Sequence, residues 1–212
     1  MRYPYYNPNL SLSVALRALF KSKYKAETSI KNYFSQLTGK KYILITNSCR
    51  TALYKAIGME GEVITTPLTC SVAIDPIEES KNVPVYADVN RGDLNINVDD
   101  IQHRITGKTI AIQAIHLGGV SCDMDQINRI GKLYNLWIIE DCAQSLGAKL
   151  NNFYTGSFGH IACFSLIKNA YGIGGGILAT DSREIYDKAW NITKNFRRTA
   201  LGLTLFRFIR NI

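Results

Sequence analysis

Residues Thr109 to Asp141, which read TIAIQAIHLGGVSCDMDQINRIGKLYNLWIIED, indicate the fold class most clearly. Residues 109–115 and 136–141 are short apolar runs, as expected of strands that are covered on both faces. Between them, residues 123–135 have the apolar spacing of a helix. A strand, a helix and a second strand in this order predict a crossover unit, in which two parallel strands are joined by a helix.

The same alternation continues on both sides of this unit. We predict further strands over residues 41–46, 62–66 and 83–89, and helices over residues 50–57, 70–80 and 97–105. The fold class that follows is α/β, with a mostly parallel sheet flanked by helices on both faces. We expect three parts along the chain: an N-terminal arm with helices (1–40), the α/β domain (41–184), and a connecting helix with the start of a missing smaller C-terminal domain (185–212).

Functional side chains are expected just after the strands, because ligands of such sheets bind beyond the carboxyl ends of the strands. Asp141 closes one strand, where a carboxylate is either catalytic or a helix cap or turn former. Ser48, Arg50 and Thr51 begin a helix directly after another strand. The N-terminus of a helix suits a phosphate, although a serine that simply caps the helix explains the same pattern. His116 follows a third strand and either contacts a ligand or is a structural histidine.

A single lysine, Lys168, lies in the stretch CFSLIKNAYGIGGGILAT (163–180), between an apolar run and a cluster of glycines. The glycines lack the spacing of a dinucleotide fingerprint and precede a strand-like run instead of a helix. We expect them to let the backbone pass close to a flat ligand or to another chain. The pattern leaves open whether the amine of Lys168 is a solvated surface group or a reagent.

Composition limits the class of partner. The chain has 25 Lys and Arg against 17 Asp and Glu, a net charge of +8, which favours anionic partners. We favour a phosphorylated small molecule over nucleic acid, because no block of like charges suits a nucleic-acid tail. Five cysteines without a CxxC pair predict no metal site and reduced thiols in a cytoplasmic protein. We see no signal peptide, and the apolar stretch 10–20 is too short for a transmembrane segment.

Several motifs, taken in order, resemble the DegT/DnrJ/EryC1/StrS family of pyridoxal-phosphate-dependent sugar aminotransferases. The most specific are EDCAQSLGA (140–148) and FSLIKN with GGGILAT (164–180), and the resemblance covers roughly residues 26–196. It implies an aspartate-aminotransferase-like (fold type I) large domain that binds pyridoxal 5′-phosphate. It also implies amino transfer from glutamate or glutamine to a nucleotide-linked keto-sugar for surface polysaccharide or glycan synthesis, and a homodimer for the full-length protein.

The resemblance assigns the residues around the cofactor ring. Lys168 matches the lysine that bonds covalently to the cofactor and later moves a proton between substrate and cofactor carbons. Asp141 matches the aspartate that faces the pyridine nitrogen and keeps it protonated. Gln144 matches the polar residue beside the ring, and Cys70 falls near the position where relatives usually hold an aromatic residue. Some relatives are dehydratases with a histidine in place of the lysine, so Lys168 implies an aminotransferase.

The resemblance also assigns the phosphate site. Ser165 matches a serine that binds the cofactor phosphate. Arg50 and Thr51 match positions at the start of a helix whose backbone N–H groups surround that phosphate.

Two departures from the family leave another function open. The loop that carries Lys168 is shorter than in most relatives, and relatives continue past Ile212 into a smaller C-terminal domain that we expect this chain to lack. The alternative is a non-catalytic or regulatory protein with the same fold, or an inactive fragment of such an enzyme. A third reading, a basic protein at membrane surfaces, rests only on residues 197–210.

Overall fold

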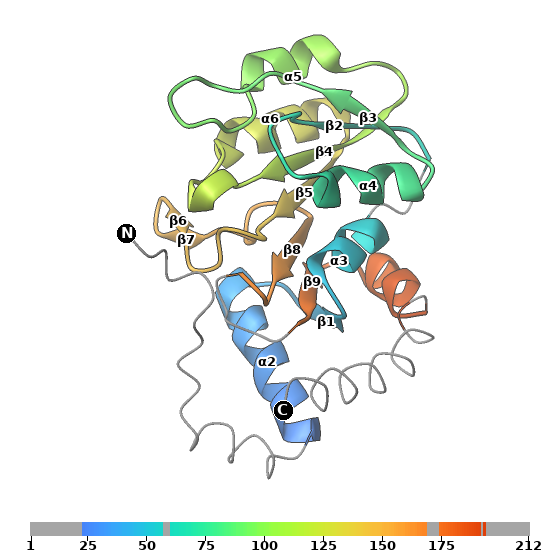
Figure 1. Cartoon of the computed structure of the whole chain (residues 1–212), viewed down its shortest axis with the longest axis vertical. Helices are drawn as coiled ribbons and strands as arrows, with labels where there is room; N and C mark the ends of the chain where they lie inside the picture. The colour runs from blue at the N-terminus through green and yellow to red at the C-terminus, as the bar shows by residue number, and fades with distance from the viewer. Residues whose placement is uncertain (1–22, 57–59, 169–173, 192, 194–212) are drawn as a thin grey trace.

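The computed structural model describes residues 23–56, 60–168, 174–191 and 193. Its centre is a seven-stranded sheet in the order β1-β9-β8-β5-β4-β2-β3 (Figure 1). The strands are β1 (Tyr42–Thr46), β2 (Glu62–Thr65), β3 (Val83–Tyr86), β4 (Thr109–Ile115), β5 (Trp137–Asp141), β8 (Ile161–Ser165) and β9 (Gly176–Thr180). Neighbouring strands are parallel except at β9, which runs antiparallel to both β1 and β8.

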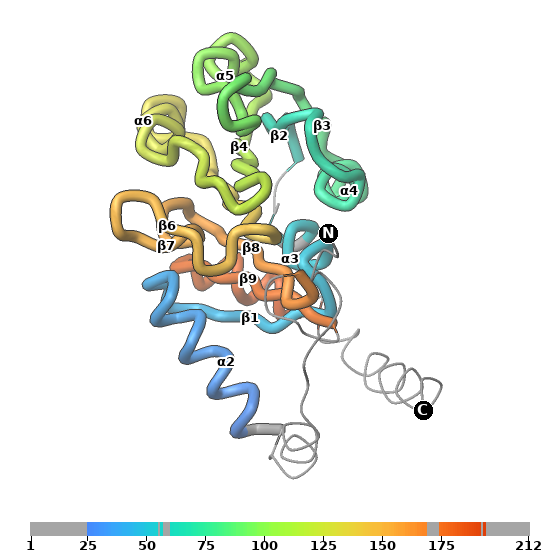
Figure 2. The backbone as a smooth tube through the Cα atoms, turned by 60° about the vertical axis from the view of Figure 1, so that its left-hand side comes forward, coloured from blue at the N-terminus to red at the C-terminus, as the bar shows by residue number. Residues whose placement is uncertain are grey.

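Helices cover both faces of this sheet (Figure 2). One face carries α2 (Lys23–Thr38), α5 (Val98–Arg104) and α6 (Met124–Tyr134), and the other carries α3 (Cys49–Ala56) and α4 (Ser71–Glu79). A further helix over residues 183–191 packs on the α3 side through Ala189. The predicted α/β class is therefore confirmed.

Side chains of β5 alternate between the two cores. Ile138 packs in the cluster under α5 and α6, and Ile139 packs in the cluster under α3 and α4. Because successive residues of a strand point to opposite faces, the next two residues, Glu140 and Asp141, are directed to different sides of the sheet. Two consecutive carboxylates thus enter different surroundings at the carboxyl end of one strand.

Two local features differ from the sequence-based expectation. The strand predicted over residues 83–89 ends at Tyr86, because its pairing with β2 ends at Thr65. The hairpin of β6 (Lys149–Leu150) and β7 (Phe153–Tyr154) was not predicted. Its turn consists of Asn151 and Asn152 with φ values of 48° and 68°, a left-handed conformation that asparagine tolerates.

The ends of the chain fall largely outside the described residues. This applies to residues 1–22 of the predicted arm and to residues 194–212 of the predicted connecting segment, including the basic stretch 197–210. The predicted division into three parts therefore stays a prediction. Within the part of the chain that the structure describes, no helix combines the length and the apolar character needed to cross a membrane.

Candidate active site

A cavity of about 220 Å³ lies beyond the carboxyl ends of β4, β5 and β8, with α3 and α4 along one wall. Six of the seven residues predicted to bind the cofactor line it: Arg50, Cys70, Asp141, Gln144, Ser165 and Lys168. The seventh, Thr51, lies in the first turn of α3 and is not among the lining residues. The fold therefore brings together most of a set that is spread over more than half of the sequence.

Asp141 contributes a buried carboxylate to this cavity. It is the last residue of β5, and only 4% of its surface is exposed. Its Oδ1 accepts the backbone N–H of Ala143 at 2.9 Å, which is the turn-forming role considered from the sequence. Burial raises the pKa of Asp141, while the Ala143 N–H and the charge of Lys168 act in the opposite direction. A buried carboxylate that is only partly compensated suits a positively charged ligand atom.

Lys168 follows β8 through the turn formed by residues 166–168 and is exposed. Its amine lines the same cavity as Asp141 and lies close enough to lower the pKa of that carboxyl. The residues that follow, 169–173, are outside the described part of the chain and include one glycine of the predicted cluster, Gly172. The position of Lys168 thus fits a reactive amine at the edge of the cavity.

The start of α3 forms the opposite wall. Ser48 Oγ accepts the backbone N–H of Thr51 at 3.1 Å, so the serine is a helix cap. At the start of a helix, the N–H groups of residues such as Cys49 and Arg50 have no acceptor within the helix, and the helix dipole adds positive potential there. A Cβ on Gly176 would collide with the backbone of Ser48 and Cys49. The close approach at Gly176 is therefore to the protein's own α3, in contrast to the flat ligand or second chain expected from the glycine cluster.

The Arg50 side chain points to α4. Its guanidinium pairs with Glu79 and lies 3.5 Å from Asp75. The role predicted for Arg50 belongs to its backbone N–H group, and it stays a prediction. Cys70 precedes α4 as its N-cap residue, is exposed and makes no side-chain capping bond.

Two further predicted residues hold loops at the rim. Gln144 Oε1 accepts the backbone N–H of Gly118 at 2.8 Å, in the short 3-10 helix η1 (Leu117–Gly119) after β4. Gly118 has φ 63°, a conformation that glycine adopts without strain. Ser165 is 7% exposed, and its Oγ accepts the N–H of Ile167 at 3.4 Å. Both side chains thus order the backbone that forms the cavity.

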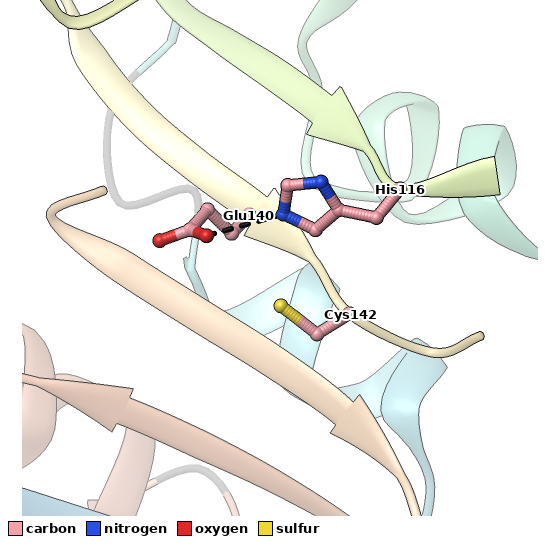
Figure 3. A group of neighbouring side chains, drawn as sticks. All are labelled: His116, Glu140 and Cys142. Carbon is pink, nitrogen blue, oxygen red and sulfur yellow. Dashed lines mark hydrogen bonds and ion pairs between the residues drawn. The ribbon is translucent and has the colours of Figure 1, made fainter. Parts of the chain in front are cut away.

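Glu140 and His116 form a buried pair (Figure 3), and His116 is also one of the residues that line the cavity. Glu140 Oε2 lies 3.1 Å from His116 Nε2, and both side chains are fully buried. The carboxylate also accepts three backbone N–H groups, those of Gly156, Phe158 and Gly159. No role was predicted for Glu140 from the sequence, although an acid inside an otherwise apolar strand indicates a side chain with buried polar partners.

A family model for the DegT/DnrJ/EryC1/StrS aminotransferase family matches residues 11–199. The chain belongs to the DegT/DnrJ/EryC1/StrS aminotransferase family. GDP-perosamine synthase of Escherichia coli O157:H7 is 34% identical over 165 residues, which cover 74% of this chain and 45% of that protein. The predicted family is therefore confirmed.

Solved structures support the same membership. The aminotransferase from Psychrobacter cryohalolentis superposes with a TM-score of 0.79 and 30% identity, covering 89% of this chain and 51% of that one. NtdA from Bacillus subtilis, solved with its cofactor PMP, has a TM-score of 0.71 and 28% identity and covers 84% and 42%. These likenesses confirm the fold type I prediction. This member of the DegT/DnrJ/EryC1/StrS family spans about half the length of the relatives that it matches.

The cofactor predicted for this DegT/DnrJ/EryC1/StrS protein, pyridoxal 5′-phosphate, is confirmed at the level of the family. The side chains of the cavity fit that group. Asp141 offers a buried carboxylate for a protonated ring nitrogen, and Lys168 offers an amine for the aldehyde. The start of α3 offers N–H groups for the phosphate. The individual residue roles stay predictions, because the likeness to whole relatives does not test single side chains.

One buried cluster of this family member has the residue types of a metal site. Ligand atoms of His116, Glu140 and Cys142 all lie within 4.8 Å of one another. Hydrogen bonds occupy both ring nitrogens and both carboxylate oxygens. Burial, followed by the charges of Glu140 and Asp141, raises the pKa of the Cys142 thiol, which disfavours the thiolate that a metal requires. These contacts favour a structural cluster, and the prediction of no metal site stays a prediction.

Proposed function

We propose that this chain is the cofactor-binding part of an aminotransferase that moves an amino group from glutamate or glutamine to a nucleotide-linked keto-sugar. The observation that carries the proposal is the cavity, in which Asp141, Lys168 and the start of α3 converge beyond the ends of three strands. Family membership supports the reaction class. The name of one relative, GDP-perosamine synthase, supports a nucleotide-linked sugar as substrate, and by resemblance the product serves surface polysaccharide or glycan synthesis.

The residues of the cavity have distinct roles in this reaction. Pyridoxal phosphate, when bound, supplies a ring that accepts the electron pair left when a neighbouring C–H bond ionises. Asp141 Oδ holds a proton on the ring nitrogen, which keeps the ring electron-withdrawing. Lys168 Nζ, unlike an arginine, can lose its proton near neutral pH, so it can first bind the cofactor and later carry a proton to or from the substrate carbon.

The phosphate is held by a different part of the cavity. N–H groups at the start of α3 point to one side of it, and Ser165 Oγ can donate a hydrogen bond from β8. Binding the phosphate fixes the distance between the ring and Lys168 Nζ. Because amino transfer requires the reacting atoms in a defined orientation, this anchoring is part of catalysis.

Surface and thiol chemistry support the remaining proposals on partners and location. The net charge of +8 attracts the diphosphate of a nucleotide sugar. Val72 and Ile167 line the cavity and are 46% and 44% exposed, which supports a homodimer in which a second copy covers its opening. All five cysteines are free, as expected in a reducing cytoplasm. The exclusion of nucleic acid stays a prediction.

The decisive experiment traps the cofactor. We expect the full chain, incubated with pyridoxal phosphate and reduced with borohydride, to carry the reduced adduct on Lys168 in peptide mapping. Lys168→Arg keeps the charge but not the reactive amine and should carry none. Lys108→Ala is the matched control, since Lys108 is exposed at the opposite end of β4 and its loss should leave the adduct intact.

Two outcomes contradict the proposal. An adduct on another lysine, or on none, overturns the assignment of Lys168. An adduct on Lys168 without conversion of the cofactor to its amino form by glutamate or glutamine favours the non-catalytic alternative. Amino transfer to a nucleotide-linked keto-sugar then tests the acceptor.

A further inference from the structure

The hydrogen bonds around His116 fix where its proton lies. Its Nδ1 accepts the backbone N–H of Cys122 at 3.1 Å, so this nitrogen carries no proton. Its Nε2 lies 3.1 Å from Glu140 Oε2. A second proton, on Nδ1, would point at the Cys122 N–H, and two N–H donors cannot form a hydrogen bond with each other. The geometry therefore describes a neutral ring with its single proton on Nε2.

Glu140 has no proton of its own to offer this contact. Its two oxygens accept the backbone N–H groups of Gly156 at 2.7 Å, Phe158 at 2.8 Å and Gly159 at 2.5 Å. Three N–H donors converging on one carboxyl group require the ionised form. The proton in the contact with His116 consequently belongs to the imidazole. Glu140 thus connects His116, the residue after β4 (Figure 3), with the turn that precedes β8.

The neutral state of His116 matters because His116, like Asp141, is one of the residues that line the cavity. The His116 backbone N–H donates to the Asp141 carbonyl at 3.2 Å, and a positive charge on the ring lowers the pKa of Asp141. An imidazolium would thus compete with the cofactor ring nitrogen for the same carboxylate. The thiols of Cys122 and Cys142, which also lie near Glu140, have pKa values raised by burial first and add no charge.

We propose that His116 is held as a neutral ring at the cofactor cavity, with Nδ1 accepting the Cys122 N–H and Nε2 donating its proton to Glu140, and that this neutral state leaves the charge of Asp141 to the cofactor. The inference deepens the proposed function and rests on it for the identity of the ligand. The protonation state of His116 itself is a property of the chain alone. It can be measured without any cofactor.

The first experiment reads that state directly. The full chain, labelled with ¹⁵N-histidine and free of cofactor, is observed by long-range ¹H–¹⁵N correlation at about pH 7. We expect His116 to show one proton, on Nε2. His103, exposed on α5, is the internal reference for a solvated ring. His116→Gln identifies the signal by its loss. A doubly protonated His116, or a proton on Nδ1, overturns the proposal.

The second experiment tests the consequence for Asp141 by titrating pyridoxal phosphate into two variants. His116→Gln removes the ring but stays neutral, whereas His116→Lys places a positive charge beside Asp141. We expect the dissociation constant of His116→Lys to exceed that of His116→Gln by at least about tenfold, because the charge competes for the carboxylate. His160→Gln, at the amino end of β8, is the control and should bind as the unmodified chain does.

The outcomes separate this inference from the proposed function. Equal binding by the two His116 variants overturns the inference, although the cofactor site stands. No binding by the unmodified chain overturns the proposed function, and the histidine spectrum still decides the state of His116. If His116→Lys does not fold, the spectrum of the unmodified chain decides alone.

Discussion

Glu140 and Asp141 are consecutive residues of β5, yet their carboxylates lie on opposite sides of the sheet and in different surroundings. On the α6 side, Glu140 is fully buried and accepts three backbone N–H groups as well as the contact from His116. On the α3 side, Asp141 borders a cavity, and burial raises its pKa in spite of the N–H of Ala143.

Glu140 is hydrogen-bonded within the protein and stabilises the fold, whereas Asp141 borders the cavity that we propose binds the cofactor. The Glu140 carboxylate accepts hydrogen bonds from donors of the protein itself. Removing the carboxylate therefore leaves those buried donors without an acceptor. The charge of Asp141 is incompletely compensated, so it costs stability in the empty protein and becomes useful when a cation enters the cavity. Three measurements test this contrast between the two carboxylates.

The largest effect should come from Asp141→Asn. We expect amino transfer to fall by about 10²- to 10³-fold, because the amide no longer stabilises a protonated ring nitrogen. The free energy of unfolding of the cofactor-free chain should stay equal or rise, since the amide carries no buried charge. Steady-state kinetics and urea unfolding measure the two quantities. Asp187→Asn, on the exposed helix 183–191, is the matched control. Near-normal turnover would make Asp141 a turn former alone.

Glu140→Gln should act mainly on stability. We expect the free energy of unfolding of the cofactor-free chain to drop by about 2–4 kcal/mol, because an amide offers one acceptor oxygen and sets its own N–H groups against buried donors. Urea unfolding is the measurement. Glu184→Gln removes an exposed partner of Lys188 and should lower the free energy of unfolding far less. Equal costs for the two variants would mean that the buried contacts of Glu140 are worth no more than a surface pair.

The smallest effect is a pH dependence of stability. Burial raises the pKa of Asp141, so the folded chain holds this proton to higher pH than the unfolded chain. The stability linked to this group is complete below the unfolded pKa and is lost as pH rises through the folded pKa. The cofactor-free chain should therefore lose more stability than Asp141→Asn between about pH 4 and about pH 7. Urea unfolding at both pH values measures this, and parallel losses would contradict it.

The sequence predicted the sheet well because the period of its apolar residues is a local property. Residues 109–115 and the helix after Asp123 appear in the structure with nearly the predicted bounds. The antiparallel direction of β9 was not predicted, because strand direction depends on the partner and not on the strand's own residues. The hairpin of β6 and β7 is too short to leave a periodic pattern.

The sequence predicted where the residues of the candidate site lie, but it did not predict most of their side-chain contacts. The rule that ligands bind beyond strand ends led to Asp141 and Lys168, and the resemblance gave their roles. The Arg50 side chain pairs with acids of α4, which depends on how two helices pack. The contact between Glu140 and His116 joins residues that no local pattern connects, so it required the structure.

The pairing of β1 has a consequence for the order in which this protein can assemble. Within the described sheet, β1 lies at one edge and its strand partner is β9, so residues 42–46 find their hydrogen bonds at residues 176–180. Such a pairing has a high sequence separation and a correspondingly large loop-closure cost. Because α3 directly follows β1 and rests against Gly176, the start of α3, which we propose binds the phosphate, acquires its final position only after Thr180 has been synthesised. A nascent chain on the ribosome therefore completes this wall of the cavity only after β9 has been made, although β1 is made much earlier.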